Sequence, residues 1–246
     1  MRLKRALFIP DCHIPYHDKY AFKLMLRAAK AWKPDIVVIL GDFGDLHCVS
    51  SHSKNPNITI DLATEVNACN DALDLVDALG ADEKYFVSGN HENRLERYLM
   101  DKAPQLFNMS TIPGLFGLKR RGWKYTPYRK HLQIGKLYVT HDCGNAGPTA
   151  AAKARDTFHG NVVIGHTHRM GLAYSGNAKR QSHVGANFGW LGDVAQADYM
   201  HQVQSSQWQL GFGTGLFEPN GTVHLAGHPI IAGSVVVEGV KYSLPS

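Results

Sequence analysis

The sequence predicts an α/β fold in which two packed β-sheets are covered by helices on their outer faces, within a single domain over residues 1–246. Three observations support this expectation. Strands and helices alternate through the first half of the chain, strands dominate from Leu172 onward, and no repeat, low-complexity stretch or linker interrupts the sequence. A chain of 246 residues is long enough to bury one ordinary core.

The first half alternates between short apolar strands and amphipathic helices. Residues 36–40 form a continuous apolar, mostly β-branched run, which is typical of a strand covered on both faces. Asp18 is a candidate N-cap for the first helix, and Gly80 is a candidate C-cap for the second. The elements expected in order are a strand at 6–9, a helix at 17–32, a strand at 36–40, a helix at 61–79, a strand at 85–87 and a helix at 93–99.

The second half changes to a strand-rich pattern. Residues 124–126, 131–134 and 137–140 predict antiparallel strands, with a turn at Gly135 and Lys136. An Ala-rich helix at 148–158 and a strand at 161–164 follow. Further strands are expected at 173–174, 181–184, 207–217, 222–225, 230–231, 234–237 and 240–242.

Composition excludes several classes of protein. The mean hydropathy of −0.23 and the 19% of charged residues argue against a disordered chain. No apolar run approaches the roughly 20 residues that a membrane-spanning helix needs. The chain opens with basic residues like a signal peptide, but the apolar stretch that follows is too short for one, so we expect a cytoplasmic protein. Four cysteines without paired spacing predict reduced thiols.

Positive charge is concentrated in one central segment. The formal net charge is +5, yet no Asp or Glu occurs between Lys102 and His141, where eight Lys and Arg residues lie. Such a segment favours an anionic partner, although a solvated loop face would show the same pattern.

Five short polar motifs directly follow predicted strands. They are Asp11-Cys12-His13, Gly41-Asp42, Gly89-Asn90-His91-Glu92, His141-Asp142 and Gly165-His166-Thr167-His168. Open α/β sheets bind ligands outside the carboxyl ends of their strands, so we expect the five motifs to meet at one rim.

The motifs provide a coherent set of metal ligands. Carboxylates, imidazoles and one amide, without a thiolate, suit Mn²⁺, Zn²⁺, Fe or Ni²⁺ better than Ca²⁺. Seven ligands are too many for one tetrahedral ion and suit two ions that share a carboxylate. The expected metal ligands are Asp11, His13, Asp42, Asn90, His141, His166 and His168.

In this order and spacing, the motifs resemble the calcineurin-like metallophosphoesterases over residues 11–168. The resemblance implies a four-layer α/β/β/α sandwich of two mixed sheets. It also implies hydrolysis of a phosphate ester by a hydroxide that bridges two divalent ions, with Mn²⁺ expected and Zn²⁺, Fe, Ni²⁺ or Mg²⁺ as alternatives. It assigns Asp11, His13 and His168 to the first metal, Asn90, His141 and His166 to the second, and Asp42 to the bridge. His91 is implied to act with Asp42 in catalysis, as the histidine that contacts the phosphate or protonates the leaving oxygen.

Neighbours of the motif residues are candidates for supporting roles. Asp45, Glu92 and Asp142 could each orient an imidazole, although Asp45 could equally cap a loop. Arg94 and Arg169 could contact a phosphate, or pair with surface acids.

Two features of the sequence bear on the class of substrate: an Arg that is missing after one motif, and a segment in which basic and aromatic residues alternate. Residues 41–47 keep a Gly-Asp-x-x-Asp pattern but lack the following Arg that protein Ser/Thr phosphatases usually carry, so they look more like the phosphodiesterase and nuclease branches. In the second segment, basic side chains alternate with aromatic ones, which suits the binding of single-stranded nucleic acid. A β-hairpin whose aromatic side chains pack inward would show the same sequence pattern. The expected DNA- or RNA-binding residues are Arg120, Arg121, Trp123, Lys124, Tyr125, Arg129 and Lys130. The alternatives are a small nucleotide, a phosphomonoester or phosphoprotein substrate, and a non-hydrolytic scaffold of the same fold.

Overall fold

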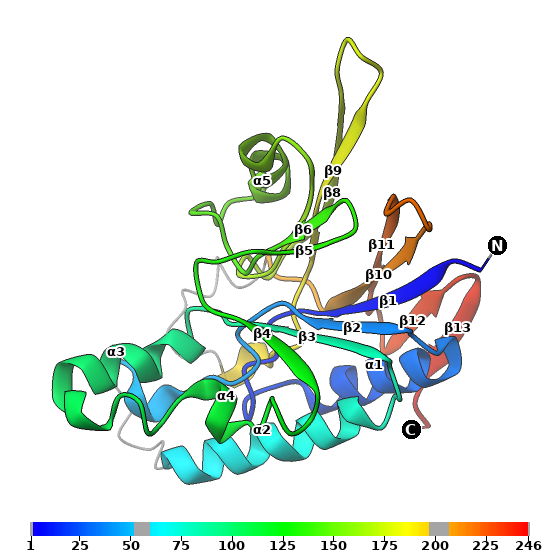
Figure 1. Cartoon of the computed structure of the whole chain (residues 1–246). Coiled ribbons are helices and arrows are strands. Elements are labelled where there is room, and N and C mark those ends of the chain that lie inside the picture. Colours follow the sequence, from blue (N-terminus) through cyan, green and yellow to red (C-terminus); the bar gives the residue numbers. More distant parts are fainter. Residues whose placement is uncertain (1, 52–59, 197–206, 246) are drawn as a thin grey trace.

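Two mixed β-sheets lie face to face in the computed structural model, which describes residues 2–51, 60–196 and 207–245. Helices α1 (Lys19–Trp32) and α2 (Leu62–Asp77) cover one sheet, and α5 (Ala150–Phe158) covers the other (Figure 1). The predicted four-layer α/β/β/α sandwich is therefore confirmed.

The first sheet has six strands in the order β11-β10-β1-β2-β3-β4. Strands β1 to β4 run parallel to one another, whereas β10 is antiparallel to both β1 and β11. Their bounds are β1 Lys4–Ile9, β2 Ile36–Ile39, β3 Glu83–Val87, β4 Trp123–Thr126, β10 Gly211–Phe217 and β11 Val223–Pro229.

The second sheet has five strands in the order β5-β6-β7-β9-β8. Strands β6, β7 and β9 are parallel, and the edge strands β5 and β8 are antiparallel to their neighbours. Their bounds are β5 Leu132–Ile134, β6 Leu137–Val139, β7 Asn161–Ile164, β8 Met170–Gly176 and β9 Ser182–Phe188.

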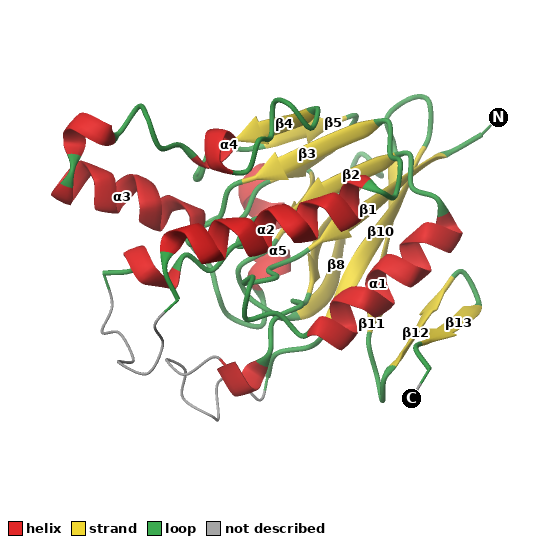
Figure 2. Ribbon diagram, turned by 90° about the horizontal axis from the view of Figure 1, so that it is seen from below, coloured by secondary structure: helices red, strands yellow, loops and turns green. Residues whose placement is uncertain are grey.

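Side-chain caps fix the starts of the two long helices. The Asp18 carboxylate accepts from the Ala21 N–H at 2.9 Å, and the Asp61 carboxylate accepts from the Thr64 N–H at 2.8 Å. Figure 2 shows α1 and α2 side by side across the first sheet, with the ribbon of β12 (Ser234–Val237) and β13 (Val240–Ser243) beside α1. The remaining elements are α3 Glu92–Lys102, α4 Ile112–Leu115 and the 3₁₀ turns η1 His47–Val49, η2 Pro104–Leu106 and η3 Val194–Gln196.

Alternation along β1 separates two cores. Leu7 and Ile9 face the outer helices, whereas Ala6 and Phe8 face the second sheet. A third, smaller core lies where α5 packs on β7. Central strands such as β2 and β7 are therefore covered on two faces, as the apolar run at 36–40 predicts.

Two expectations need correction. Residues 124–126 do not form a hairpin with 131–134, because β4 joins the parallel edge of the first sheet beside β3, while β5 begins the second sheet. Short apolar strands do not reveal which sheet they enter, since pairing partners are chosen by long-range contacts. Residues 230–231 form a single bridge, from Ile231 to Ser234, and no strand. The other predicted elements are present, with shifted ends, in the described parts of the chain. The single-domain expectation stays a prediction. In those same parts, no helix has the length and apolar character required to cross a bilayer.

Candidate metal centre

The five motifs meet at one edge of the sandwich, as the strand directions require. Strands β1, β2 and β3 of the first sheet, and β6 and β7 of the second, all end there. Their loops are joined by backbone hydrogen bonds, including His13 N–H to the Asp42 carbonyl at 2.9 Å and Gly165 N–H to the His141 carbonyl at 2.9 Å. The rim is therefore a network of loops held by both sheets.

Glycines allow these loops to approach one another closely. Gly41 has φ +93°, and a Cβ placed there would collide with Nδ1 of His141. A Cβ on Gly89 would collide with Oδ1 of Asp42. The glycine preceding each of these motifs is thus required by packing at the site.

The first cluster contains Asp11, His13 and His168. The Nε2 atoms of His13 and His168 lie 3.1 Å apart, and Nε2 of His168 lies 3.6 Å from Oδ1 of Asp11. Both imidazoles are buried, and burial lowers the pKa of each, well below its ordinary value for His168. Neutral imidazoles whose nitrogens converge are the form that binds a metal ion.

The second cluster contains Asp42, His141 and His166, with Asn90 beside it. Nε2 of His141 lies 3.0 Å from Oδ1 of Asn90 and 3.3 Å from Oδ2 of Asp42. Nδ1 of His141 donates to the Leu40 carbonyl at 2.8 Å, which leaves Nε2 as the nitrogen directed into the cluster.

The carboxylates at the site are buried in a way that suits cations. Asp11 is fully buried, burial raises its pKa to about 8, and its Oδ2 has no hydrogen-bond partner among the described residues. Burial would also raise the pKa of Asp42, but His141 and His91 beside it bring that pKa well below its ordinary value. A buried carboxylate that has one unpartnered oxygen and lies close to two imidazoles fits a divalent cation. The expected ligands are thus brought together; which of them bind metal stays a prediction.

His91 lies between the two clusters. Its backbone N–H donates to Oδ1 of Asp42 at 2.8 Å, and its ring Nε2 is 3.8 Å from Oδ2 of the same carboxylate. Its Nδ1 lies 3.0 Å from the Asp45 carbonyl. Burial alone would lower the pKa of His91, but the carboxylates of Asp42 and Asp45 raise it above its ordinary value.

Asp45 and Arg94 form a supporting network around these histidines. Oδ2 of Asp45 lies 3.2 Å from Nδ1 of both His13 and His91, so one carboxylate orients both rings. Arg94 Nη1 donates to the Asp45 carbonyl at 2.8 Å and to Oδ1 at 3.0 Å, and its Nη2 lies 3.0 Å from Nε2 of His91. Asp45 therefore occupies the position that the sequence suggested for it.

The other predicted supporting residues have different contacts. Among the residues that the structure describes, Glu92 forms no hydrogen bond to an imidazole; it accepts the backbone N–H groups of Asp42, Gly44 and Gly89 at 2.7–2.9 Å. Asp142 accepts the Gly144 N–H at 3.0 Å. Arg169 donates to the Ala146 and Thr167 carbonyls and to Gln207, and so braces loops.

This geometry agrees with comparison to known proteins. The sequence pattern described as calcineurin-like phosphoesterase matches residues 4–170. The chain belongs to this family. The resemblance inferred from the five motifs is thereby confirmed.

Relatives of this family member are distant. The Gene 54 protein of Mycobacterium phage D29 is 26% identical over 263 residues, covering 96% of this chain and 97% of that protein. The Gene 54 protein of Mycobacterium phage L5 is also 26% identical, with coverages of 85% and 87%. Among solved structures, Vps29 of Chaetomium thermophilum superposes with a TM-score of 0.51 at 12% identity, covering 98% of this chain and all of that one (100%). At that identity the likeness shows the fold alone.

Two tryptophans that the sequence did not indicate lie against the first cluster. Trp190 stacks on His168, with ring centroids 4.8 Å apart and planes at 14°, and Trp208 meets the edge of the same ring at 4.4 Å. Trp190 follows β9, which runs parallel to β7, so its loop reaches the same rim. The sequence could have indicated Trp190 as a residue that follows a sixth strand end. It did not, because the predicted strand stopped at Val184 whereas β9 continues to Phe188.

Three of the seven residues expected to bind nucleic acid around β4 face inward, and nucleic-acid binding itself stays a prediction. Trp123 is 5% exposed, and its Nε1 donates to Asp77, while Arg121 binds Asp74 and Asp77 on α2. Tyr125 packs beside Phe86 in the core. Trp123 and Tyr125 face inward because they are alternate residues of the sheet strand β4, whereas Arg121, before the strand, is held by its ion pairs to α2.

The rest of that segment is exposed. Lys124 lies over the ring of Tyr85, and Arg120, Arg129 and Lys130 are open to solvent. Tyr128, next to Arg129, places its ring 6.2 Å from that of the metal-site residue His141. Only this end of the basic segment approaches the site.

Proposed function

We propose that the protein hydrolyses phosphodiesters with two divalent metal ions, and acts on nucleic acid or nucleotides. The observation that carries the proposal is the pair of His and Asp clusters beside Asp42, with His91 between them. Family membership supports the same reaction class.

The chain offers ligands for two ions, and Mn²⁺ is the ion that we propose. Asp11, His13 and His168 would hold one ion, and Asp42, His141 and His166 would hold the other, with Asn90 beside them. Asp42 is proposed as the ligand that the two ions share, as family membership suggests. When bound, the two ions lower the pKa of a water and neutralise charge on the phosphoryl oxygens. Mixed oxygen and nitrogen donors without thiolate support Mn²⁺, with Zn²⁺, Fe, Ni²⁺ and Mg²⁺ as alternatives.

His91 is proposed to hold or deliver a proton at the leaving oxygen. Its Nδ1 is engaged by Asp45, so Nε2 is the atom available to a substrate. Two carboxylates favour its protonated form. Since Nε2 then carries a proton, Arg94 would have to turn its Nη2 away, which would free that guanidinium for a phosphoryl oxygen.

One observation favours a second candidate, a phosphomonoesterase. The guanidinium of Arg94 lies at the site although the Arg of the protein-phosphatase motif is absent, and a fixed guanidinium suits a dianionic phosphate. Against this candidate, the Gly-Asp-x-x-Asp pattern of residues 41–47, which lacks the following Arg, supports a phosphodiester as the substrate.

The test compares bis-p-nitrophenyl phosphate with p-nitrophenyl phosphate in the presence of Mn²⁺. We expect faster turnover of the diester, and a loss of about 10²–10⁴-fold in His91→Ala, the range for one general acid. His224→Ala, an exposed histidine paired with Glu218 away from the site, is the matched control and should be unchanged. Faster monoester turnover would support the phosphomonoesterase instead.

A non-hydrolytic scaffold is the remaining alternative. It predicts that turnover of both esters stays at the buffer level while metal binds. Asp42→Ala then separates binding from hydrolysis: on our proposal it abolishes turnover, whereas a scaffold has none to lose.

A further inference from the structure

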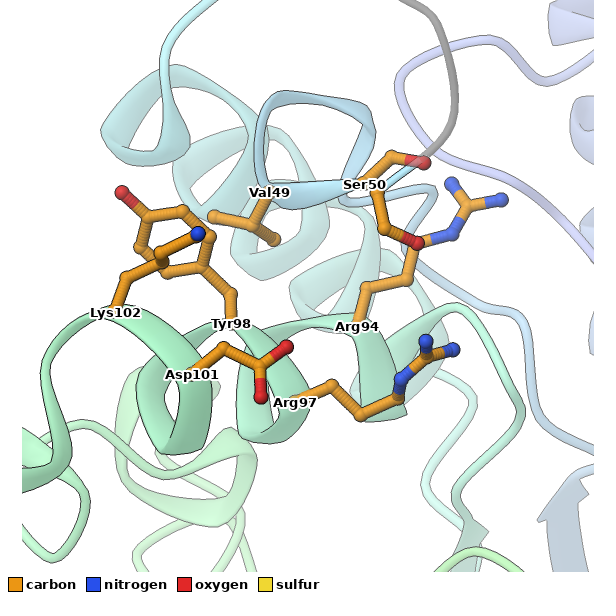
Figure 3. A pocket seen from close by; sticks show the side chains of 8 residues that line it. Val49, Ser50, Arg94, Arg97, Tyr98, Asp101 and Lys102 are labelled. Atoms are coloured by element: carbon orange, nitrogen blue, oxygen red, sulfur yellow. The ribbon is translucent and has the colours of Figure 1, made fainter.

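A pocket of about 250 Å³ opens beside the metal centre along helix α3. Figure 3 shows its side chains, with Arg94 and Arg97 at one end, Tyr98 and Lys102 at the other, and Asp101 between them. It is lined by Val49, Ser50, Ser51, Arg94, Arg97, Tyr98, Asp101 and Lys102.

Arg94 connects this pocket to the candidate reaction site. Its side chain lines the pocket, while its Nη2 lies 3.0 Å from Nε2 of His91. Arg97 is one helical turn further along α3, at a rise of about 4.5 Å, and shares a face with Arg94. The pocket is thus a continuation of the candidate site, on the side away from the two clusters that would bind metal.

The charge of the pocket is predominantly positive and largely uncompensated. Arg94 is committed to Asp45, but Arg97 and Lys102 form no ion pair with any residue that the structure describes. Asp101 is the single carboxylate among the lining residues. Tyr98 adds an aromatic ring that is 42% exposed.

We propose that this pocket binds a second, non-reacting phosphate of the substrate, one nucleotide away from the phosphate at the metal centre. This rests on the proposed function and narrows it to substrates with more than one phosphate. Arg97, at the end nearer His91, contacts this phosphate, Lys102 at the other end contacts the next phosphate along the chain, and Tyr98 provides a face on which a base stacks. A simple diester such as bis-p-nitrophenyl phosphate has no group to place there.

The first test measures binding, independently of turnover. A fluorescein-labelled octathymidylate with hydrolysis-resistant phosphorothioate linkages is titrated with the Mn²⁺-loaded protein by anisotropy at several salt concentrations. For Arg97→Gln and Lys102→Gln we expect affinity to fall about three- to tenfold each, and the salt slope to shrink by about 0.7 per lost phosphate contact. Asp101→Asn should act in the opposite direction and tighten binding. Lys23→Gln, an exposed cation on α1, is the matched control.

A further variant distinguishes the sources of the phosphate. Tyr98→Leu should weaken octathymidylate but not tripolyphosphate as a competitor if the ligand is a nucleotide chain. If Tyr98→Leu weakens the binding of neither ligand, the stacking role of Tyr98 is overturned and the pocket recognises phosphate groups alone.

Two outcomes separate this inference from the proposed function. If Arg97→Gln and Lys102→Gln leave both affinity and salt slope at the wild-type values while the diester is hydrolysed, the pocket inference is overturned and the function stands. If no ester is hydrolysed but the variants lose affinity, the pocket binds phosphate and the hydrolytic function is overturned. The Lys23→Gln control should hydrolyse bis-p-nitrophenyl phosphate at the wild-type rate.

Discussion

Glu92→Gln tests how the loops of the metal centre are held. The carboxylate is fully buried and accepts N–H groups of Asp42, Gly44 and Gly89 at 2.9, 2.9 and 2.7 Å. In its best orientation, Gln keeps an oxygen toward Asp42 and Gly89 but turns an NH₂ group toward the Gly44 N–H. One orphaned buried donor costs about 1–3 kcal/mol, and the two remaining bonds weaken because the acceptor is neutral.

Removal of a buried charge offsets part of this loss, because burial raises the pKa of Glu92 and so disfavours its ionised form. We therefore expect a net loss of about 2 kcal/mol in the free energy of unfolding. For a chain of 246 residues this corresponds to a drop in Tm of about 4–8 °C.

Differential scanning calorimetry of the metal-free protein measures this effect. Glu96→Gln, one turn further along α3, is the control, because the Glu96 side chain makes no hydrogen bond within the described residues; it should change stability by less than about 0.5 kcal/mol. Glu92→Gln should also weaken Mn²⁺ binding, because the acceptor shared by the loops that carry Asp42 and Asn90 becomes neutral and holds them less tightly. A Tm equal to that of the wild type would refute the view that Glu92 holds these loops.

Three further predictions address other parts of the molecule. Arg121→Ala removes ion pairs to Asp74 and Asp77, and should lower the free energy of unfolding, measured in urea, by about 2 kcal/mol. The affinity for octathymidylate should not change. A change in affinity without a change in stability would indicate that Arg121 contacts nucleic acid. Burial lowers the pKa of His228, so the unfolded chain takes up this proton more readily, and stability is lost as pH falls below about 6.5. The Tm loss between pH 7.5 and 5.5 should be smaller in His228→Gln, and an equal loss would contradict this. Asp11→Asn should raise the Tm of the metal-free protein at pH 7, because burial raises the pKa of Asp11 to about 8 and so makes its ionised form unfavourable. It should also abolish the stabilisation by Mn²⁺, which is about 2.7 kcal/mol when the metal is at a hundredfold excess over Kd. A metal-induced shift in Tm equal to that of the wild type would exclude Asp11 as a ligand.

The metal-centre residues were accessible to sequence reasoning because their signals are local. Each motif follows a strand directly, and parallel strands bring their carboxyl ends to one edge. The glycines of Gly41-Asp42 and Gly89-Asn90 carry the same information, since close approach of backbone to Asp42 and His141 tolerates no side chain.

The sequence did not predict which side chains of the basic segment face inward. Residues 119–131 look alike whether they form a hairpin or a sheet edge, and only the pairing of β4 with β3 decides that Trp123 faces Asp77. The direction of a side chain on a strand depends on which neighbour it pairs with, and this is a long-range choice.

By itself, the sequence determined the layered α/β fold, the family and the set of residues gathered at the rim, because strand periodicity and strand-end motifs are short-range patterns. Tertiary structure alone decided that Glu92 binds backbone rather than imidazole, that Trp190 stacks on His168, and that Arg94 joins the metal centre to the pocket along α3. These contacts link residues from different loops and strands, and their geometry depends on how the elements pack around them.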